Sequence, residues 1–316
     1  MRIASAVAAL ALASCATNRP TAIVDVPSQV PAAIEAQLLQ IGRVVAPPQT
    51  AALYAPLAQK EPYADVKVTR DVAYGPDARH RLDVFEPAAG ASGRPVLVFV
   101  HGGAFVGGNK RTGDSPFYDN VMLWAVANGM VGVNATYRLA PQSQWPEAQR
   151  DLARVVQWVR QGVASHGGNP SRIYLMGHSA GAAHVAQYVG HPELQAVPGG
   201  GIAGAIMVSG LFDTTTAEPN PPLQAYFGTD RSQYAPRSAL PGMVASGLPM
   251  MLAHAELDPP DFHQQAEQAH SALCAARRCP DSYRLLGHSH MSEVYSVNTP
   301  DRGLAGAIRA FVAGQR

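Results

Sequence analysis

Apolar and polar residues follow two different periods along most of the chain. Short, nearly continuous apolar runs such as "RPVLVFV" at 94–100 predict strands buried on both faces. Between these runs, apolar residues recur at three- and four-residue steps, which predicts helices. The expected strands are 66–75, 81–87, 94–103, 130–137, 172–177, 205–210, 248–254 and 282–286, and the expected helices are 117–128, 146–165, 180–189, 261–276 and 302–312.

This alternation predicts an α/β domain over residues 66–316, with a mostly parallel central sheet of about eight strands and helices on both faces. The first two strands, 66–75 and 81–87, are expected to pair antiparallel through a turn at Gly75-Pro76-Asp77. No internal repeat competes with this interpretation.

The segment 31–65 has a helical pattern of its own. It places Ile34, Leu38, Ile41 and Val45 on one stripe, and a second short helix is expected at 49–57. Two interpretations stay open: these helices pack on the body of the domain, or they form a cap over a substrate cleft.

The first 15 residues, "MRIASAVAALALASC", resemble an export signal, with a leading arginine and a short apolar core. Leu12-Ala13-Ser14-Cys15 resembles the lipobox of bacterial lipoproteins, which implies a signal peptide over 1–15 and lipidation of Cys15. An ordinary secretion signal and a misassigned start codon are the alternatives. Residues 16–30 are expected to be a linker, and the protein is expected to be exported, either periplasmic or lipid-anchored to the cell envelope.

Composition narrows the class of partner. Charged residues make up only 15% of the 316 positions, the formal net charge is +1, and no lysine/arginine block occurs, so a nucleic acid or an acidic partner is not expected. A small neutral molecule fits better. No run reaches the roughly 18 apolar residues that span a bilayer, so membrane contact is expected only through the N-terminal lipid, and the sequence leaves the oligomeric state open.

Two further cysteines, Cys274 and Cys279, lie in "LCAARRC" near an expected helix end. In an exported chain they are expected to form a disulfide; two free buried thiols are the alternative. A metal site is not expected there, because no CxxC or neighbouring histidine pair completes a tetrahedral set.

The candidate nucleophile is Ser179 in "LMGHSAGAAH". It follows an expected buried strand and precedes an expected helix, and Gly177 and Gly181 permit the sharp turn that exposes its hydroxyl above the carboxyl edge of the sheet. A hydroxyl is a weak nucleophile, so acyl transfer also needs a base, an acid and donors for an oxyanion. In "HGGAFVGGNK", the backbone amides of Gly102 and Gly103, with that of Ala180, are the expected donors.

Together, "HGGAF", "YRLAPQSQWPEAQRD", "GNPSRIYLMGHSAG" and "AELDPPD" resemble the α/β-hydrolase superfamily, specifically its hormone-sensitive-lipase and carboxylesterase-like branch. The resemblance runs from about Val66 to the C-terminus. It implies an α/β-hydrolase fold and ester hydrolysis without a metal or organic cofactor, with the triad in the chain order Ser, Asp, His.

The resemblance places the catalytic acid at Asp258, with Asp261 as the near rival and Asp213 as a distant one. For the base, "LLGHSHMSEVYS" offers two histidines. His290 is preferred, because its position before Met291 resembles the histidine-Phe pairing of formamidase-like and feruloyl-esterase-like relatives; His288 is then expected to pack or to hydrogen-bond in the loop.

Other polar residues near these motifs are expected to be structural. Arg138 and Asp151 are interpreted as an ion pair, and His178 as a bystander or wall residue. Candidates for substrate contact are Phe105, Trp145, Phe212 and Tyr226, with the segment 213–247 helping to form a cap.

The sequence therefore predicts a serine hydrolase that cleaves carboxylic esters of small acyl or aryl groups through an acyl-enzyme. An amidase or arylformamidase with the same triad is the alternative within hydrolases. Two hypotheses from other classes of protein remain. One is a metal-dependent hydrolase with His288 and His290 as a ligand pair, and the other is a non-catalytic binding protein that retains the strand-turn-helix elbow.

Overall fold

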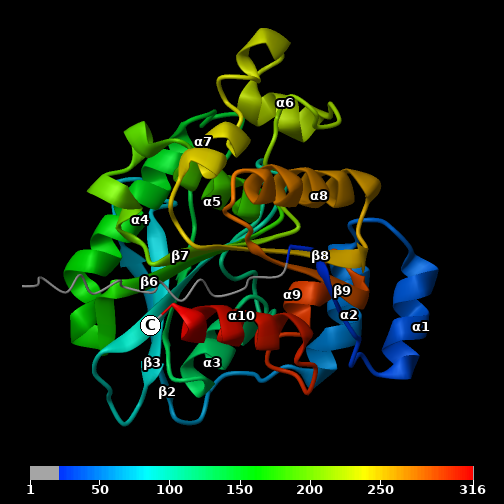
Figure 1. Cartoon of the computed structure of the whole chain (residues 1–316). Coiled ribbons are helices and arrows are strands. Elements are labelled where there is room, and N and C mark those ends of the chain that lie inside the picture. Colours follow the sequence, from blue (N-terminus) through cyan, green and yellow to red (C-terminus); the bar gives the residue numbers. More distant parts are fainter. Residues whose placement is uncertain (1–20, 316) are drawn as a thin grey trace, which may run out of the picture.

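The computed structural model describes residues 21–315. The expected signal segment 1–15 with Cys15, and residues 16–20 of the expected linker, lie outside the described residues. A nine-stranded sheet in the order β1-β9-β8-β7-β6-β4-β5-β3-β2 forms the centre of the molecule (Figure 1). The strands are β1 (Val24–Val26), β2 (Val66–Ala73), β3 (Arg81–Pro87), β4 (Arg94–Val100), β5 (Val131–Ala135), β6 (Gly168–His178), β7 (Gly204–Val208), β8 (Met250–Leu257) and β9 (Asp281–Ser289).

The sheet is mostly parallel, as the pattern predicts. Each neighbouring pair from β5 through β4, β6, β7, β8 and β9 to β1 is parallel, whereas β3 pairs antiparallel with both β5 and β2. The expected antiparallel pair of β2 and β3 is therefore confirmed. Because the strands from β4 to β9 run the same way, their carboxyl ends meet at one edge of the sheet, where sites of open α/β sheets form.

The strand missing from the sequence prediction is β1, which lies inside the range 16–30 expected to be a linker. Val24–Val26 pairs parallel with β9 at the edge of the sheet, and Asp25 forms an ion pair with Arg284 of β9 at 2.7 Å. Three residues are too few to show a strand period, which explains why the pattern gives no signal. The linker assignment is thus wrong for this part of the range.

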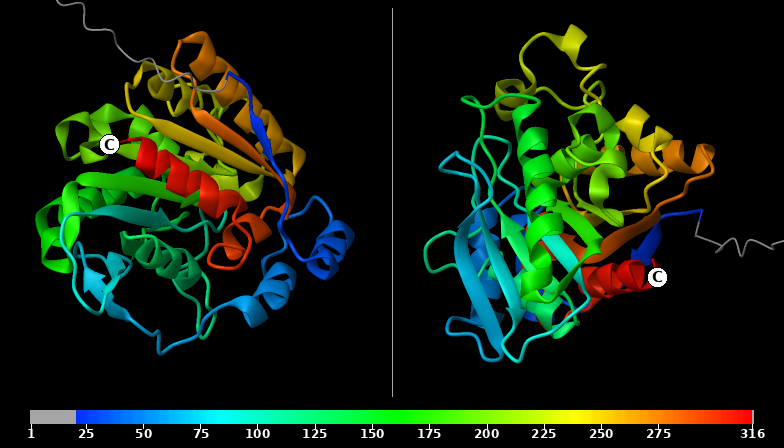
Figure 2. Two further views of the ribbon diagram at one scale, coloured as in Figure 1. Left: turned by 60° about the horizontal axis from the view of Figure 1, so that its bottom comes forward. Right: turned by 90° about the vertical axis from the view of Figure 1, so that its left-hand side faces the viewer.

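Helices cover both faces of the sheet (Figure 2). On one face lie α4 (Glu147–Gly162), α5 (Ala180–Gly190) and α8 (Pro260–Ala275), and on the other lie α3 (Asp119–Ala127) and α10 (Gly303–Gly314). These five helices match the five that the apolar period predicts. The remaining helices are α1 (Ala32–Ile41), α2 (Pro47–Tyr54), α6 (Pro221–Phe227), α7 (Leu240–Ala245) and α9 (Ser292–Tyr295).

The strand β4 shows how one apolar run serves two cores. Val96, Val98 and Val100 face the layer of α4 and α5, whereas Leu97 and Phe99 face the layer of α3 and α10. All five side chains are buried, and burial of one such side chain stabilises the fold by roughly 1.5–3 kcal/mol. The sheet is thereby held between two apolar layers, and this packing fixes the positions of its strand ends.

Two further predictions concern segments outside the sheet. Cys274 of α8 forms a disulfide with Cys279, with an S–S distance of 2.17 Å. Within residues 21–315, none of the helices has both the length and the apolar character needed to cross a bilayer.

Candidate active site

Ser179 lies at a tight turn between β6 and α5. Its backbone has φ 58° and ψ −125°, a region that residues with a side chain rarely adopt. The turn needs glycine on both sides, because a Cβ on Gly177 would lie 2.2 Å from the carbonyl oxygen of Gly181, and one on Gly181 would lie 2.1 Å from that of Val100. The amide of Ser179 donates to the carbonyl of Val208 (2.9 Å), which ties the turn to β7. This geometry is the strand-turn-helix elbow expected from the sequence.

An imidazole and a carboxylate are paired beyond the ends of β8 and β9. His290 Nδ1 donates to Asp258 Oδ1 at 2.7 Å, and both side chains are fully buried. Asp258 Oδ2 accepts from Ser209 Oγ (2.6 Å) and from the amide of Ala255 (2.8 Å). Burial alone raises the pKa of Asp258, but its hydrogen bond with His290 and the contacts with Ser209 and Ala255 outweigh burial and hold this pKa below the ordinary value.

The bond to Asp258 selects the tautomer of His290. Because a carboxylate oxygen can only accept, Nδ1 carries the proton and Nε2 keeps a free lone pair. Nε2 is buried and has no hydrogen-bond partner among the described residues, so Ser179 Oγ does not bond to it in this structure. In ligand-free enzymes such bonds are often long and tighten only when the substrate binds.

Three backbone amides lie beside Ser179. Gly102, Gly103 and Ala180 line the same cavity as the serine, and in the described residues no acceptor bonds to the amide of Gly102 or of Gly103. Ala180 is the first residue of α5, so its amide lies at the positive end of the helix dipole. A Cβ on Gly102 would lie 3.0 Å from Cβ of Ser179, and Gly103 has φ 130°. This part of the chain therefore requires glycine and presents donors that suit a developing oxyanion.

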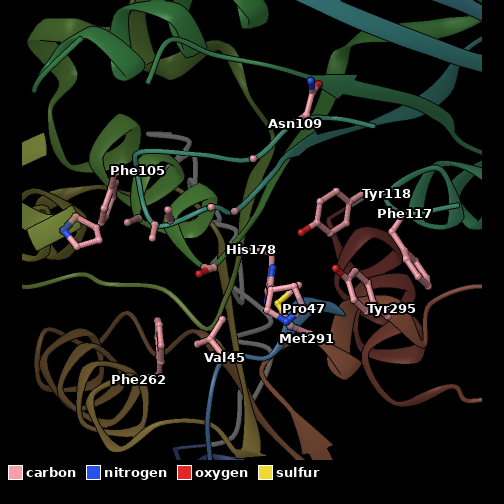
Figure 3. A pocket seen from close by; sticks show the side chains of 18 of the residues that line it. Val45, Pro47, Phe105, Asn109, Phe117, Tyr118, His178, Phe262, Met291 and Tyr295 are labelled. Atoms are coloured by element: carbon pink, nitrogen blue, oxygen red, sulfur yellow. The ribbon is translucent and has the colours of Figure 1, made fainter. Parts of the chain in front are cut away.

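These groups open on a cavity of about 610 Å³ (Figure 3). In the figure, Phe105 and Phe262 lie on one side of His178, and Tyr118, Tyr295 and Phe117 lie on the other. Part of the wall comes from α2 and the loop before it, through Val45, Pro47, Pro48 and Ala51, and part comes from α6, through Pro222 and Leu223. The lining is mainly apolar, as in pockets that accept small organic molecules.

One of the four expected substrate contacts lies in this cavity, and three do not. Phe105 lines it. Tyr226 instead stacks behind Phe105 at 5.1 Å and donates its hydroxyl to Gln149 (2.8 Å). Trp145 donates Nε1 to Gln187, and Phe212 is buried in the core. The prediction is wrong for Trp145, Phe212 and Tyr226, because a loop position in the sequence does not show which way its side chain points.

The rival acids and the rival base have other partners. Asp213 accepts hydrogen bonds from Thr215 and Ser238, and Asp261 lies in the first turn of α8 and lines the cavity without a bond to His290. Both ring nitrogens of His288 are engaged, with Ser292 Oγ and with Asp301 Oδ2, each at 3.1 Å. His288 is therefore a hydrogen-bonding residue, as expected, but it lies near the end of β9 and not in a loop.

Arg138 and Asp151 form the expected ion pair at 2.6 Å. Asp151 is fully buried and also accepts from the amide of Arg138 (2.9 Å) and from His80 Nε2 (2.9 Å). The pair fixes the loop between β5 and α4. His178 lines the cavity wall beside Ser179, and its Nε2 lies 2.8 Å from the carbonyl oxygen of His290.

Several residues of the site have no signal in the sequence. Phe262 packs on the ring of His290 with centroids 4.5 Å apart, and Ser209 supports Asp258. Tyr118 lines the cavity from the loop before α3, and Tyr295 lines it from α9. The pattern "DPPDF" places Phe262 near the acid, but no pattern predicts that two tyrosines so distant in the chain meet at one wall.

A serine at the strand-helix turn, a buried imidazole-carboxylate pair and nearby backbone amides at the carboxyl edge of a mostly parallel sheet are typical of the α/β-hydrolase fold. Comparison with known proteins agrees. The BD-FAE family model matches residues 82–198. Esterase LipQ of Mycobacterium tuberculosis is 30% identical over 77% of this chain and 62% of its own length. Para-nitrobenzyl esterase of Bacillus subtilis is 32% identical over 43% of this chain and 29% of its own length.

Solved structures show the same fold. Esterase B from Lactobacillus Rhamnosis superposes with a TM-score of 0.69 at 17% identity, over 90% of this chain and 94% of its own. A bacterial heroin esterase superposes with a TM-score of 0.66 at 24% identity, over 90% of this chain and 97% of its own. The chain therefore has an α/β-hydrolase fold, and its sequence is similar to those of curated esterases. It spans less than two thirds of the length of the curated relatives named above.

Proposed function

We propose that this protein is a carboxylic ester hydrolase that works through an acyl-enzyme on Ser179. The observation that carries the proposal is a common cavity. Ser179, Gly102, Gly103 and Ala180 line one mainly apolar binding space. The hydrogen-bonded His290–Asp258 pair is buried next to residues that line it, among them His178 and Phe262. The relatives named above that are called esterases support the reaction class.

In this mechanism, Ser179 Oγ attacks the ester carbonyl carbon while His290 Nε2 takes its proton. Asp258 stabilises the imidazolium that results. The carbonyl oxygen becomes an oxyanion and accepts hydrogen bonds from the three amides. Collapse of the tetrahedral intermediate breaks the bond to the alcohol, which leaves with the proton from Nε2, and water then releases the acid by the same steps.

The size and lining of the cavity favour small substrates. About 610 Å³ lies in the range of pockets for small organic molecules. Small acyl or aryl esters fit between the aromatic side chains. We also infer from the resemblance of residues 1–15 to a lipoprotein signal that the protein is exported, periplasmic or lipid-anchored to the cell envelope.

The test is hydrolysis of p-nitrophenyl esters of increasing acyl length by the purified full chain, beside Ser179→Ala. We expect turnover of short esters, lower rates for acyl chains of about twelve carbons or more, and loss of activity in the variant. A fluorophosphonate should modify Ser179 in the folded protein. Unmodified Ser179 and no turnover of any ester would refute the proposal. An aryl formamide assayed in parallel separates ester from amide hydrolysis.

A further inference from the structure

A second carboxyl group lies behind the imidazole of His290. Glu293, in α9, has no exposed surface, and neither of its oxygens has a geometrically satisfactory hydrogen bond within the described residues. Its Oε1 lies 3.3 Å from Nε2 of His178. Among residues 21–315, no lysine or arginine forms an ion pair with it. A buried acid with no cation beside it needs a physical explanation, because burying a carboxylate costs several kcal/mol.

The groups that face Glu293 come from the carboxyl ends of four strands. They are His178 at the end of β6, Ser209 after β7, Asp258 after β8 and His290 after β9. His178 Nε2 lies 2.8 Å from the carbonyl oxygen of His290, and a carbonyl only accepts, so this nitrogen carries a proton. Burial lowers the pKa of His178 to about 3, so the ring is neutral and cannot serve as the counter-ion.

Two carboxyl groups thus lie in one buried cluster, and no lysine or arginine among residues 21–315 forms an ion pair with Glu293, so the charge of one disfavours ionisation of the other. Asp258 is the ionised member, because it accepts three hydrogen bonds, from His290, Ser209 and Ala255. Glu293 is the protonated member. Burial, and then the charge of Asp258, raises its pKa well above the ordinary value, and the nearby Ser209 offsets this only in part.

A protonated carboxyl group offers one donor and one acceptor. Its Oε1 lies 3.3 Å from Nε2 of His178, whose proton is donated to the carbonyl oxygen of His290 at 2.8 Å. Glu293 therefore packs against the residue before the nucleophile, which in turn contacts the backbone of the base.

We propose that Glu293 is a positioning residue of this site: as a neutral carboxylic acid packed against His178, whose Nε2 bonds to the carbonyl oxygen of His290, it fixes the turn that carries the imidazole of His290. The inference rests on the proposed ester hydrolysis. Glu293 touches neither substrate nor the reacting atoms. Its contribution is to hold the imidazole where it can accept the proton of Ser179, and misplacement of a catalytic group by about 1 Å costs on the order of a hundredfold in rate.

The experiment compares three full-length variants with wild type. Glu293→Gln keeps a neutral donor and acceptor of the same shape, Glu293→Met keeps the volume without either, and Glu193→Gln alters an exposed acid on the surface as the control. We expect Glu293→Gln to keep kcat within about threefold. Glu293→Met should lower kcat by about 10- to 100-fold with KM nearly unchanged, because the substrate cavity is not altered. Circular dichroism and Tm show whether each variant is folded.

The protonation state is measured separately, by the infrared absorption of a carboxylic acid in wild type at pH 7. We expect a band that disappears in Glu293→Gln and persists in Glu193→Gln. A folded Glu293→Met with wild-type kcat, an inactive but folded Glu293→Gln, or an infrared difference without a carboxylic acid band would each overturn the inference. If wild type hydrolyses no ester and Ser179 resists a fluorophosphonate, the proposed function fails, and the infrared result still decides the state of Glu293.

Discussion

Replacing Asp258 by asparagine tests the proposed triad most directly, because the structure shows how an amide must settle there. Oδ2 accepts from Ser209 Oγ (2.6 Å) and from the amide of Ala255 (2.8 Å), whereas Oδ1 faces only His290 Nδ1. In Asp258→Asn, the amide oxygen is expected to take the Oδ2 position, where it keeps both donors. The NH₂ group then points at His290 Nδ1.

The opposite orientation is worse. It would place the NH₂ group against the amide of Ala255, and a buried donor without an acceptor costs about 1–3 kcal/mol. Ser209 can rotate its hydroxyl, but the backbone of β8 cannot turn. His290 must therefore accept at Nδ1 and carry its proton on Nε2, which is the wrong tautomer for a base.

A triad with this tautomer loses about 10³- to 10⁴-fold in kcat, which corresponds to roughly 4–5.5 kcal/mol in the barrier. The assay is kcat on a short p-nitrophenyl ester at pH 7–8, with Tm as the check on folding. The matched control is Asp261→Asn, since Asp261 lines the same cavity without contacting His290; its kcat is expected to stay within a few-fold. If Asp258→Asn turned over at near wild-type rate, the tautomer argument and the acid assignment would both fail.

Three further predictions concern stability and folding. Burial lowers the pKa of four histidines from 6.5 to about 3 or 4, namely His101, His178, His184 and His254. Below pH 6.5 only the unfolded chain binds these protons, so the free energy of unfolding should fall by about 2 kcal/mol per histidine at pH 5; equal urea midpoints at pH 7 and pH 5 would contradict this. Asp151→Asn should destabilise the fold by about 1–3 kcal/mol, measured by urea denaturation, because its buried NH₂ group would face the donors of His80 and Arg138, while Glu147 keeps its ion pair with Arg138. Gly181→Ala should abolish fluorophosphonate labelling of Ser179, since the added Cβ would meet the carbonyl of Val100 at 2.1 Å; normal labelling would show that the turn can relax.

The central sheet and its covering helices could be predicted because each carries a repeated signal. The run at β4 is apolar on both faces, and α4 has apolar residues at helical steps, so period and length together identify each element. The strand-turn-helix elbow was also predictable, because a serine flanked by Gly177 and Gly181 after a buried strand is typical of that turn. Where the signal is three residues long, as at β1, there is no period to detect.

Side-chain partners inside the site could not be predicted in the same way. Phe105 and Tyr226 are both aromatic loop or helix-end residues in the sequence, but one faces the cavity and the other lies behind it with its hydroxyl on Gln149. Glu293 reads as an ordinary polar residue of a short helix, and only the meeting of four strand ends shows that it is buried beside Asp258. Such facts depend on long-range contacts, which local periodicity does not encode.

The segment that contributes Val45, Pro47, Pro48 and Ala51 to the cavity lies between β1 and β2 in the chain, and β1 pairs with β9 at the edge of the sheet. Part of the wall of the proposed binding space therefore comes from a stretch of the chain that holds none of the proposed reacting groups. A protein expressed from residue 59 onward would retain the elbow, the acid and the base but would lack one side of the binding space. Changes confined to residues 42–51 are accordingly a route to altered acyl preference that leaves the reacting groups untouched.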